Sequence, residues 1–199
     1  MLWINRQMLK INSTAFRLVL SSLLFICLYT SSAFCATANN HSQANFFQHF
    51  SGNLATELTL AKEQKKFGVL LFFGTKHCPF CRRMKRTVFN QINVQQHYQS
   101  HFRLLDIDIE STQHLTDEKN QRLSHIDYAK AHRVRLTPTI VFLDLNGELR
   151  YRQVGMIADP QEFIWLAQYV TSGQTKEQNF STYKMHKRSR HQGQWFDYF

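Results

Sequence analysis

Apolar positions in the first half of the chain follow helical and extended patterns in turn. In residues 45–66 they recur every three or four positions, which predicts one face of a helix, with a break at Ser51-Gly52-Asn53. The unbroken apolar run that follows predicts a buried strand. The expected elements are thus a broken helix at 45–66, a strand at 67–73, helices at 82–90 and 94–101, and a strand at 102–109.

The second half of the chain begins with a polar stretch at 110–123, which we interpret as a surface insertion. Ser124 and Asp127 then form a capping-box pattern that opens a helix reaching about Arg133. Further on, Asn146-Gly147 is the strongest short signal for a hairpin. It predicts antiparallel pairing of 139–144 with 148–154, followed by a helix from Asp159-Pro160 to Gly173.

This order of elements predicts an α/β fold. Helices and strands alternate and are followed by an antiparallel hairpin, which is typical of a mixed central sheet with helices on both faces. We expect about four to five strands, in a domain spanning residues 45–173. A flexible linker is expected at 39–44, and a basic, disordered tail at 174–199.

The first 38 residues have the pattern of a secretory signal peptide. Arg6, Lys10 and Arg17 precede a mostly apolar stretch at 18–29, and the segment ends in Ala36-x-Ala38. The apolar stretch is shorter than the roughly 20 residues that a spanning helix needs. We therefore predict an exported, soluble protein, and an uncleaved N-terminal anchor stays as the alternative.

Charge adds one indication about partners. The chain has 24 Lys and Arg against 14 Asp and Glu, a net charge of +10. Without the three basic residues of the signal the balance is 21 − 14, about +7, which favours acidic partners or surfaces. No module that combines aromatic and basic residues is evident, so nucleic-acid binding is not predicted. Weak contact of the basic tail with anionic surfaces is a further option.

The candidate chemistry lies in two cysteines. Of four cysteines, Cys27 and Cys35 lie in the predicted signal, which leaves Cys78 and Cys81. Pro79 suits the first turn of a helix, so Cys78 would lie at a helix N-terminus, where a thiolate is stabilised. Cys81, one turn later, could attack a mixed disulfide formed at Cys78. A zinc site would need further ligands at suitable spacing, so we predict a redox dithiol without metal or cofactor.

A second candidate site lies at Thr137-Pro138. Of three prolines in the chain, Pro79 and Pro160 are explained by predicted helix starts. Pro138 instead opens an apolar strand, which makes it a candidate for a cis peptide bond.

Residues 45–172 resemble a thioredoxin-fold protein. Two motifs carry the resemblance: Cys78-Pro79-Phe80-Cys81 after a strand, and Thr137-Pro138-Thr139 before a hairpin. The resemblance implies that Cys78 and Cys81 are catalytic and that Thr137 and Pro138 bind an incoming peptide. Pro79 and Phe80 would help to set the redox potential, and His77, if protonated, would support the thiolate. The finer pattern, with Arg133 to Thr139 and Gly155, is similar to exported SoxW-type thioredoxins.

This likeness implies an exported thiol–disulfide oxidoreductase of the bacterial periplasm that acts as a reductant. Its partners would be protein disulfides or dithiols and a membrane or periplasmic thiol electron donor. Two departures stand out: Phe72 replaces a buried aspartate and His77 replaces a tryptophan. The alternatives are an oxidant that introduces disulfides, and a Cu(I) delivery protein that adds Met84 or His77 to the two thiolates.

Overall fold

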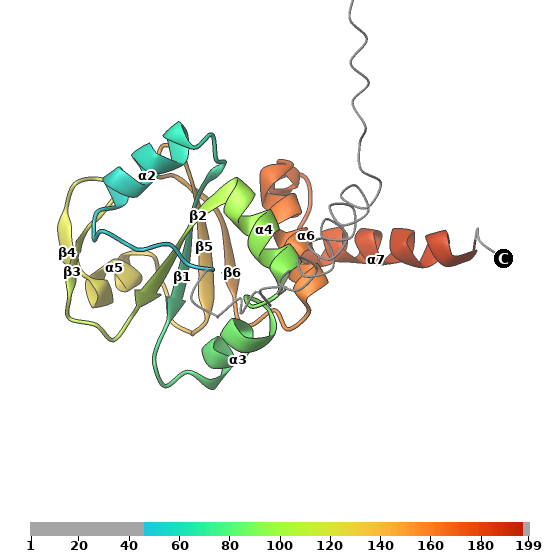
Figure 1. Ribbon diagram of the computed structural model, residues 1–199, viewed down its shortest axis with the longest axis horizontal. Coiled ribbons are helices and arrows are strands. Elements are labelled where there is room, and N and C mark those ends of the chain that lie inside the picture. Colours follow the sequence, from blue (N-terminus) through green and yellow to red (C-terminus); the bar gives the residue numbers. More distant parts are fainter. Residues whose placement is uncertain (1–45, 197–199) are drawn as a thin grey trace, which may run out of the picture. The chain divides into compact units, whose positions relative to one another are not determined.

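A computed structural model describes residues 46–196, and side chains up to residue 190 (Figure 1). The predicted signal peptide at 1–38 and the linker at 39–44 lie outside the described residues. Among the described helices, none combines the length and the apolar character needed to cross a membrane.

A four-stranded mixed sheet forms the centre of the described domain. Its strand order is β2-β1-β5-β6, with β1 parallel to β2, and antiparallel pairing of β1 with β5 and of β5 with β6. This arrangement confirms the predicted α/β class and the predicted hairpin at Asn146-Gly147. The strands are β1 (Gly68–Gly74), β2 (Phe102–Asp108), β5 (Thr139–Asp144) and β6 (Leu149–Val154).

Helices cover both faces of the sheet because β1 is buried along its whole length and alternates its side chains between two apolar clusters. Leu70 and Phe72 belong to the cluster that includes side chains of α3, α4 and α6. Leu71 and Phe73 belong to the cluster under α2 and α5, on the other face (Figure 1). The helices are α2 (Leu54–Glu63), α3 (Pro79–Thr87), α4 (Ile92–His101), α5 (His125–Ala131) and α6 (Pro160–Thr171).

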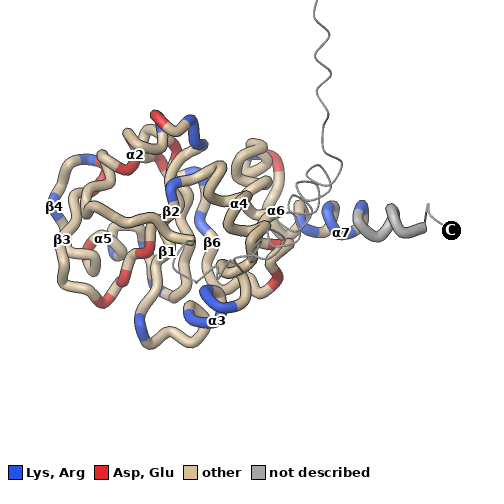
Figure 2. The backbone as a smooth tube through the Cα atoms, viewed as in Figure 1, with Lys and Arg blue, Asp and Glu red and all other residues tan. Residues whose placement is uncertain are grey.

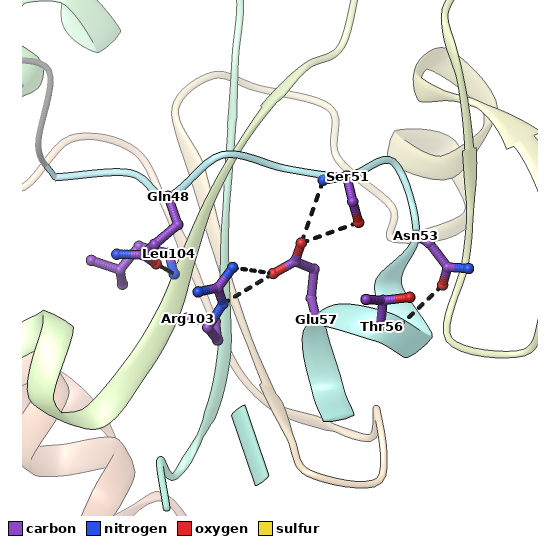
Figure 3. Close-up of polar contacts among 7 residues, drawn as sticks. All are labelled: Gln48, Ser51, Asn53, Thr56, Glu57, Arg103 and Leu104. Carbon is purple, nitrogen blue, oxygen red and sulfur yellow. Dashed lines mark hydrogen bonds and ion pairs between the residues drawn. The ribbon is translucent and has the colours of Figure 1, made fainter. Parts of the chain in front are cut away.

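The segment before α2 differs from the sequence prediction. Residues 46–52 are not helical, and α2 begins only after Asn53, whose side chain caps it. The backbone N–H of Gln48 donates to the Leu104 carbonyl at 2.9 Å, and its side-chain oxygen accepts from the Leu104 N–H at 2.5 Å (Figure 3). Because β2 is an edge strand, these bonds satisfy backbone groups that a helix at 45–50 would leave unpaired.

The polar stretch at 110–123 is more ordered than a plain surface insertion. It contributes β3 (His114–Thr116) and most of β4 (Arg122–Ser124), which pair as an antiparallel hairpin. Leu115 is buried against the α2 and α5 face of the sheet. A single buried leucine in a polar stretch gave too little pattern to predict these strands.

The predicted disordered tail is instead folded over most of its length. Residues 174–176 form the 3-10 helix η2, and α7 runs from Phe180 to Phe196. Phe180 and Tyr183 pack against Tyr169 of α6, and Lys184 and Arg188 pair with Glu162. Apolar positions are sparse in this part of the tail, and one of them, Met185, is exposed, which explains why the sequence pattern is weak.

Candidate active site

The cysteine pair lies where β1 passes through a short loop into α3. Cys78 is the N-cap residue of α3, and Pro79 takes the first helical position as predicted. The Cys78 and Cys81 sulfurs form a disulfide, with the two Cα atoms 5.3 Å apart. The Cys81 backbone N–H also donates to Cys78 Sγ at 3.1 Å. An N–H aimed at this sulfur, together with the helix dipole, would stabilise a thiolate there after reduction.

The two cysteines differ in how far they can be reached. Cys78 is 7% exposed and Cys81 is 2% exposed. An incoming disulfide therefore meets the Cys78 sulfur first, whereas Cys81 can react only with a sulfur already held at Cys78. This difference is what an attacking role for Cys78 and a resolving role for Cys81 would require.

The space beneath Cys81 is apolar and tightly filled. A Cβ atom at Gly74 would lie 3.3 Å from Cys81 Sγ and 3.1 Å from the Phe72 ring. Phe72, at the position where the resemblance implies an aspartate, is fully buried. The carboxylate is thus absent from this position, and an aromatic ring edge lies in its place.

Lys85 and Asp106 are two ionisable groups close to Phe72. They form an ion pair, and Lys85 Nζ lies 5.5 Å from the centre of the Phe72 ring. Burial raises the pKa of Asp106, an effect that Lys85 partly offsets. Together with Gly74, the pair lines a cavity of about 190 Å³. Sequence reasoning missed this pair; the signal available was the spacing of Cys81 and Lys85, which places both on one helix face.

The Thr137-Pro138 loop packs against the cysteine pair. Its peptide bond is cis. The Thr137 carbonyl oxygen lies 3.5 Å from Cys78 Sγ, and Pro138 is buried. The Pro138 carbonyl accepts from the Gly155 N–H at 2.9 Å, which ties the loop to the end of β6. The structure therefore brings together two motifs that lie 59 residues apart in the sequence.

The remaining predicted site residues lie at the surface beside Cys78. His77, Pro79 and Phe80 are all exposed. Thr75 holds the loop, since both its carbonyl and its side-chain oxygen accept from the Cys78 N–H, at 3.3 and 3.1 Å. Phe80 thus lies at the surface and does not fill the core.

Metal ligands do not gather at this site. Among residues 46–190, no group of three His, Cys, Asp or Glu side chains could hold a metal ion. Met84, which the Cu(I) alternative would use, is fully buried in the core cluster, whereas His77 is exposed.

Comparison with known proteins identifies the family. The sequence model of the thioredoxin-like domain family matches residues 54–171, which is more than half of the chain. The chain belongs to this family. No curated protein matches the sequence.

Two solved structures share the fold of this thioredoxin-like chain. A thioredoxin-fold protein from Helicobacter pylori is 20% identical, with a TM-score of 0.59 over 74% of this chain and 95% of that one. An oxidoreductase named DsbH is 18% identical, with a TM-score of 0.51 over 73% of this chain and 98% of that one. At these identities the likeness establishes the fold.

Proposed function

We propose that this thioredoxin-like protein is an exported thiol–disulfide oxidoreductase that reduces disulfides in other proteins of the bacterial periplasm. The observation that carries the proposal is the position of Cys78 Sγ, at the N-terminus of α3 and 3.5 Å from the Thr137 carbonyl. A thiolate there would be stabilised by the helix and would lie beside a backbone segment able to align a partner.

The proposed cycle is an exchange of two electrons between disulfides. The Cys78 thiolate attacks one sulfur of a partner disulfide, so that a mixed disulfide forms and the partner's other sulfur leaves as a thiolate. Cys81 then loses its proton and attacks Cys78 Sγ, which releases the second partner sulfur and leaves the Cys78–Cys81 disulfide. The partner is reduced by two electrons. A membrane or periplasmic dithiol donor would then supply two electrons that reduce the Cys78–Cys81 disulfide again.

Proton removal from Cys81 follows a different route from one that uses a carboxylate at position 72. Phe72 offers no acceptor, so the proton would pass to water or to the Lys85–Asp106 pair, which lines the adjoining cavity. Asp106 and Asp108 both line this cavity together with Gly74, and Asp106 is the one that pairs with Lys85.

Oxidation of dithiols in partner proteins, the reverse of the proposed cycle, is a second candidate function, and one observation favours it. Lys76, Arg82 and Arg83 are exposed near Cys78, and Arg82 donates to the Lys76 carbonyl at 3.2 Å. Positive charge favours the thiolate and hence the reduced form, which makes a dithiol more oxidising. The assignment as a reductant rests on the similarity of the sequence pattern to SoxW-type thioredoxins.

The equilibrium reduction potential of the Cys78–Cys81 pair, measured against glutathione in the metal-free protein, tests the direction. A value near −270 mV supports the reductant, and a value near −120 mV would instead identify an oxidant. Cys81→Ala should accumulate partners disulfide-linked to Cys78, since the resolving thiol is missing. Cys78→Ala/Cys81→Ala is the matched control and should capture none. If Cys81→Ala forms no adducts with protein disulfides, thiol–disulfide exchange is not the function.

A further inference from the structure

Three segments of the chain meet around Cys78. The first is 75–87, which holds the cysteines and α3; the second is 130–143, which holds the Thr137-Pro138 loop; the third is 153–158, after β6. The contact of 3.5 Å between Cys78 Sγ and the Thr137 carbonyl joins the first two. The hydrogen bond from Gly155 to Pro138 and the pairing of Thr139 with Val154 join the second and third.

These three segments contain no Asp or Glu but eight Lys and Arg, five in the first segment and three in the second. Lys85 pairs with Asp106, and Lys130 pairs with Asp127, which both lie outside the three segments. The other six are exposed, and Figure 2 shows α3 with basic residues and no acidic ones. They are Lys76, Arg82, Arg83, Arg86, Arg133 and Arg135.

Each segment also exposes one large apolar side chain. Phe80 is 55% exposed, Leu136 is 66% exposed and Val154 is 49% exposed. Phe80 lies between the two cysteines in sequence, and Leu136 immediately precedes Thr137. Each of the three segments that meet around Cys78 thus exposes one large apolar side chain. This grouping indicates a contact surface rather than scattered exposure.

The cations are close enough to act on whatever binds at Cys78. Arg135 is two residues from Thr137, so its Cα atom lies within about 7.6 Å of the Thr137 Cα atom. Arg82 is held against the Lys76 carbonyl, two residues before Cys78. Charges at such distances lie within about one Debye length at physiological salt, so they add to one another.

We propose that this surface selects protein disulfides whose cysteine is accompanied by an apolar residue and flanked by Asp or Glu. This inference rests on the proposed function and adds the class of partner. The apolar side chains would supply contact area, and the excess of positive charge on the three segments would steer acidic segments to Cys78 and repel basic ones.

The test compares three synthetic peptides with the same disulfide loop and one leucine beside a cysteine, flanked by four Glu, four Gln or four Lys. The rate of reduction by the pre-reduced protein should follow the order Glu, Gln, Lys. At low salt the Glu peptide should react about tenfold faster than the Lys peptide, and 1 M salt should nearly remove the difference, because the Debye length then falls to about 3 Å.

Charge reversal locates the effect. Arg83→Glu/Arg135→Glu leaves four exposed cations against two new carboxylates on this surface, so the advantage of the Glu peptide over the Lys peptide should become much smaller. Lys119→Glu/Arg122→Glu, on the β3–β4 hairpin, makes the same change in net charge at exposed positions away from Cys78 and should preserve the full advantage of the Glu peptide. All rates are divided by the rate with bis(2-hydroxyethyl) disulfide, a neutral compound, so that changes in thiol reactivity cancel.

The outcomes separate the two proposals. If no disulfide is reduced, including the neutral compound, the proposed function fails. If all three peptides react at equal rates while the neutral compound is reduced, the partner selection is wrong and the proposed function stands. If the hairpin variant reduces the advantage of the Glu peptide as much as the surface variant does, net charge rather than this surface decides selection, which overturns the inference as well.

Discussion

At the scale of single residues, the site depends on one position that carries no functional group. Gly74 ends β1 directly beneath Cys81, and the space for a side chain there is already occupied by the Cys81 sulfur and the Phe72 ring. Glycine allows the strand and the first turn of α3 to approach this closely.

Gly74→Ala should therefore impair the resolving cysteine. The added methyl group would lie 3.3 Å from Cys81 Sγ, so that the sulfur or the Phe72 ring must shift. We expect a loss of about 1–3 kcal/mol in unfolding free energy, as for other overpacked sites, and slower closure of Cys81 onto a mixed disulfide. Urea unfolding and stopped-flow release of a thiol leaving group measure the two effects.

Gly173→Ala serves as the control for stability alone. Gly173 has φ of +76° and open space around its missing Cβ, so alanine there should cost about 1–2 kcal/mol through backbone strain. Closure by Cys81 should keep its normal rate in this variant. A normal closure rate in Gly74→Ala would contradict the importance of the contact.

The sequence pointed to the residues that the proposed chemistry would use but not to those that shape their surroundings. Cys78, Cys81 and Pro138 were recognisable because their types and spacing are rare and their chemistry is specific. Gly74 and Asp106 depend on contacts between β1, β2 and α3, which no local pattern encodes. The filled space at Gly74 and the Lys85–Asp106 pair became visible only in the assembled fold.

At the scale of elements, a buried ion pair joins α2 to β2. Arg103 donates two hydrogen bonds to Glu57 Oε2, at 3.0 and 2.5 Å, and Glu57 Oε1 accepts from the backbone and side chain of Ser51 (Figure 3). Glu57 is almost wholly buried. The same carboxylate thus fixes the helix, the edge strand and the extended segment before Asn53.

Glu57→Leu should destabilise the protein by about 3–5 kcal/mol, because it leaves the Arg103 guanidinium buried without its partner. Glu57→Leu/Arg103→Leu should cost less than Glu57→Leu alone, since the double change removes the uncompensated charge. Equilibrium urea unfolding of the single and double variants measures both.

An exposed ion pair gives the matched control. Lys130→Gln removes a pair with Asp127 in which both side chains are more than half exposed, and should cost less than about 1 kcal/mol. If Glu57→Leu costs no more than Lys130→Gln, the pair does not hold α2 on the sheet.

Local signals predicted the elements that have their own caps and turns. Asn53, Ser124 and Asp159 cap α2, α5 and α6 through side-chain bonds to the backbone, and the last two were predicted as helix starts. The segment at 46–52 was predicted wrongly because its Phe spacing suits a helix, whereas edge-strand pairing and aromatic packing decide its structure. Phe46 stacks on Phe89 with ring centres 4.2 Å apart.

At the scale of the whole described domain, the two faces of the sheet have different tasks. The face under α3, α4 and α6 contains the cysteines, whereas the other face holds α2, α5 and the β3–β4 hairpin without a reactive group of the proposed cycle. The unbroken apolar run of β1 predicted a buried strand, and the alternation of helices and strands predicted that both faces are covered. These patterns could not predict which polar residues become buried or half-buried when the helices pack, and three of these are histidines.

These histidines should make the stability of the whole domain depend on pH. Burial lowers the pKa of His97, His125 and His132 below the ordinary value. Repulsion from His101 adds to this for His97, whereas Asp108 and Glu118 oppose it for His125 and His132. The unfolded chain therefore binds more protons than the folded one below about pH 6.5, so stability is highest above that pH and decreases as the pH falls towards the folded pKa values.

Urea unfolding of the oxidised protein at pH 7.5 and pH 5.5 measures this dependence, and the protein should be less stable at pH 5.5. His97→Gln/His125→Gln should flatten the difference, because glutamine binds no proton in either state. His186→Gln is the matched control: His186 is exposed on α7, and its replacement should leave the difference unchanged. A protein that is equally stable or more stable at pH 5.5 would show that these histidines are as free to take up protons when folded as when unfolded.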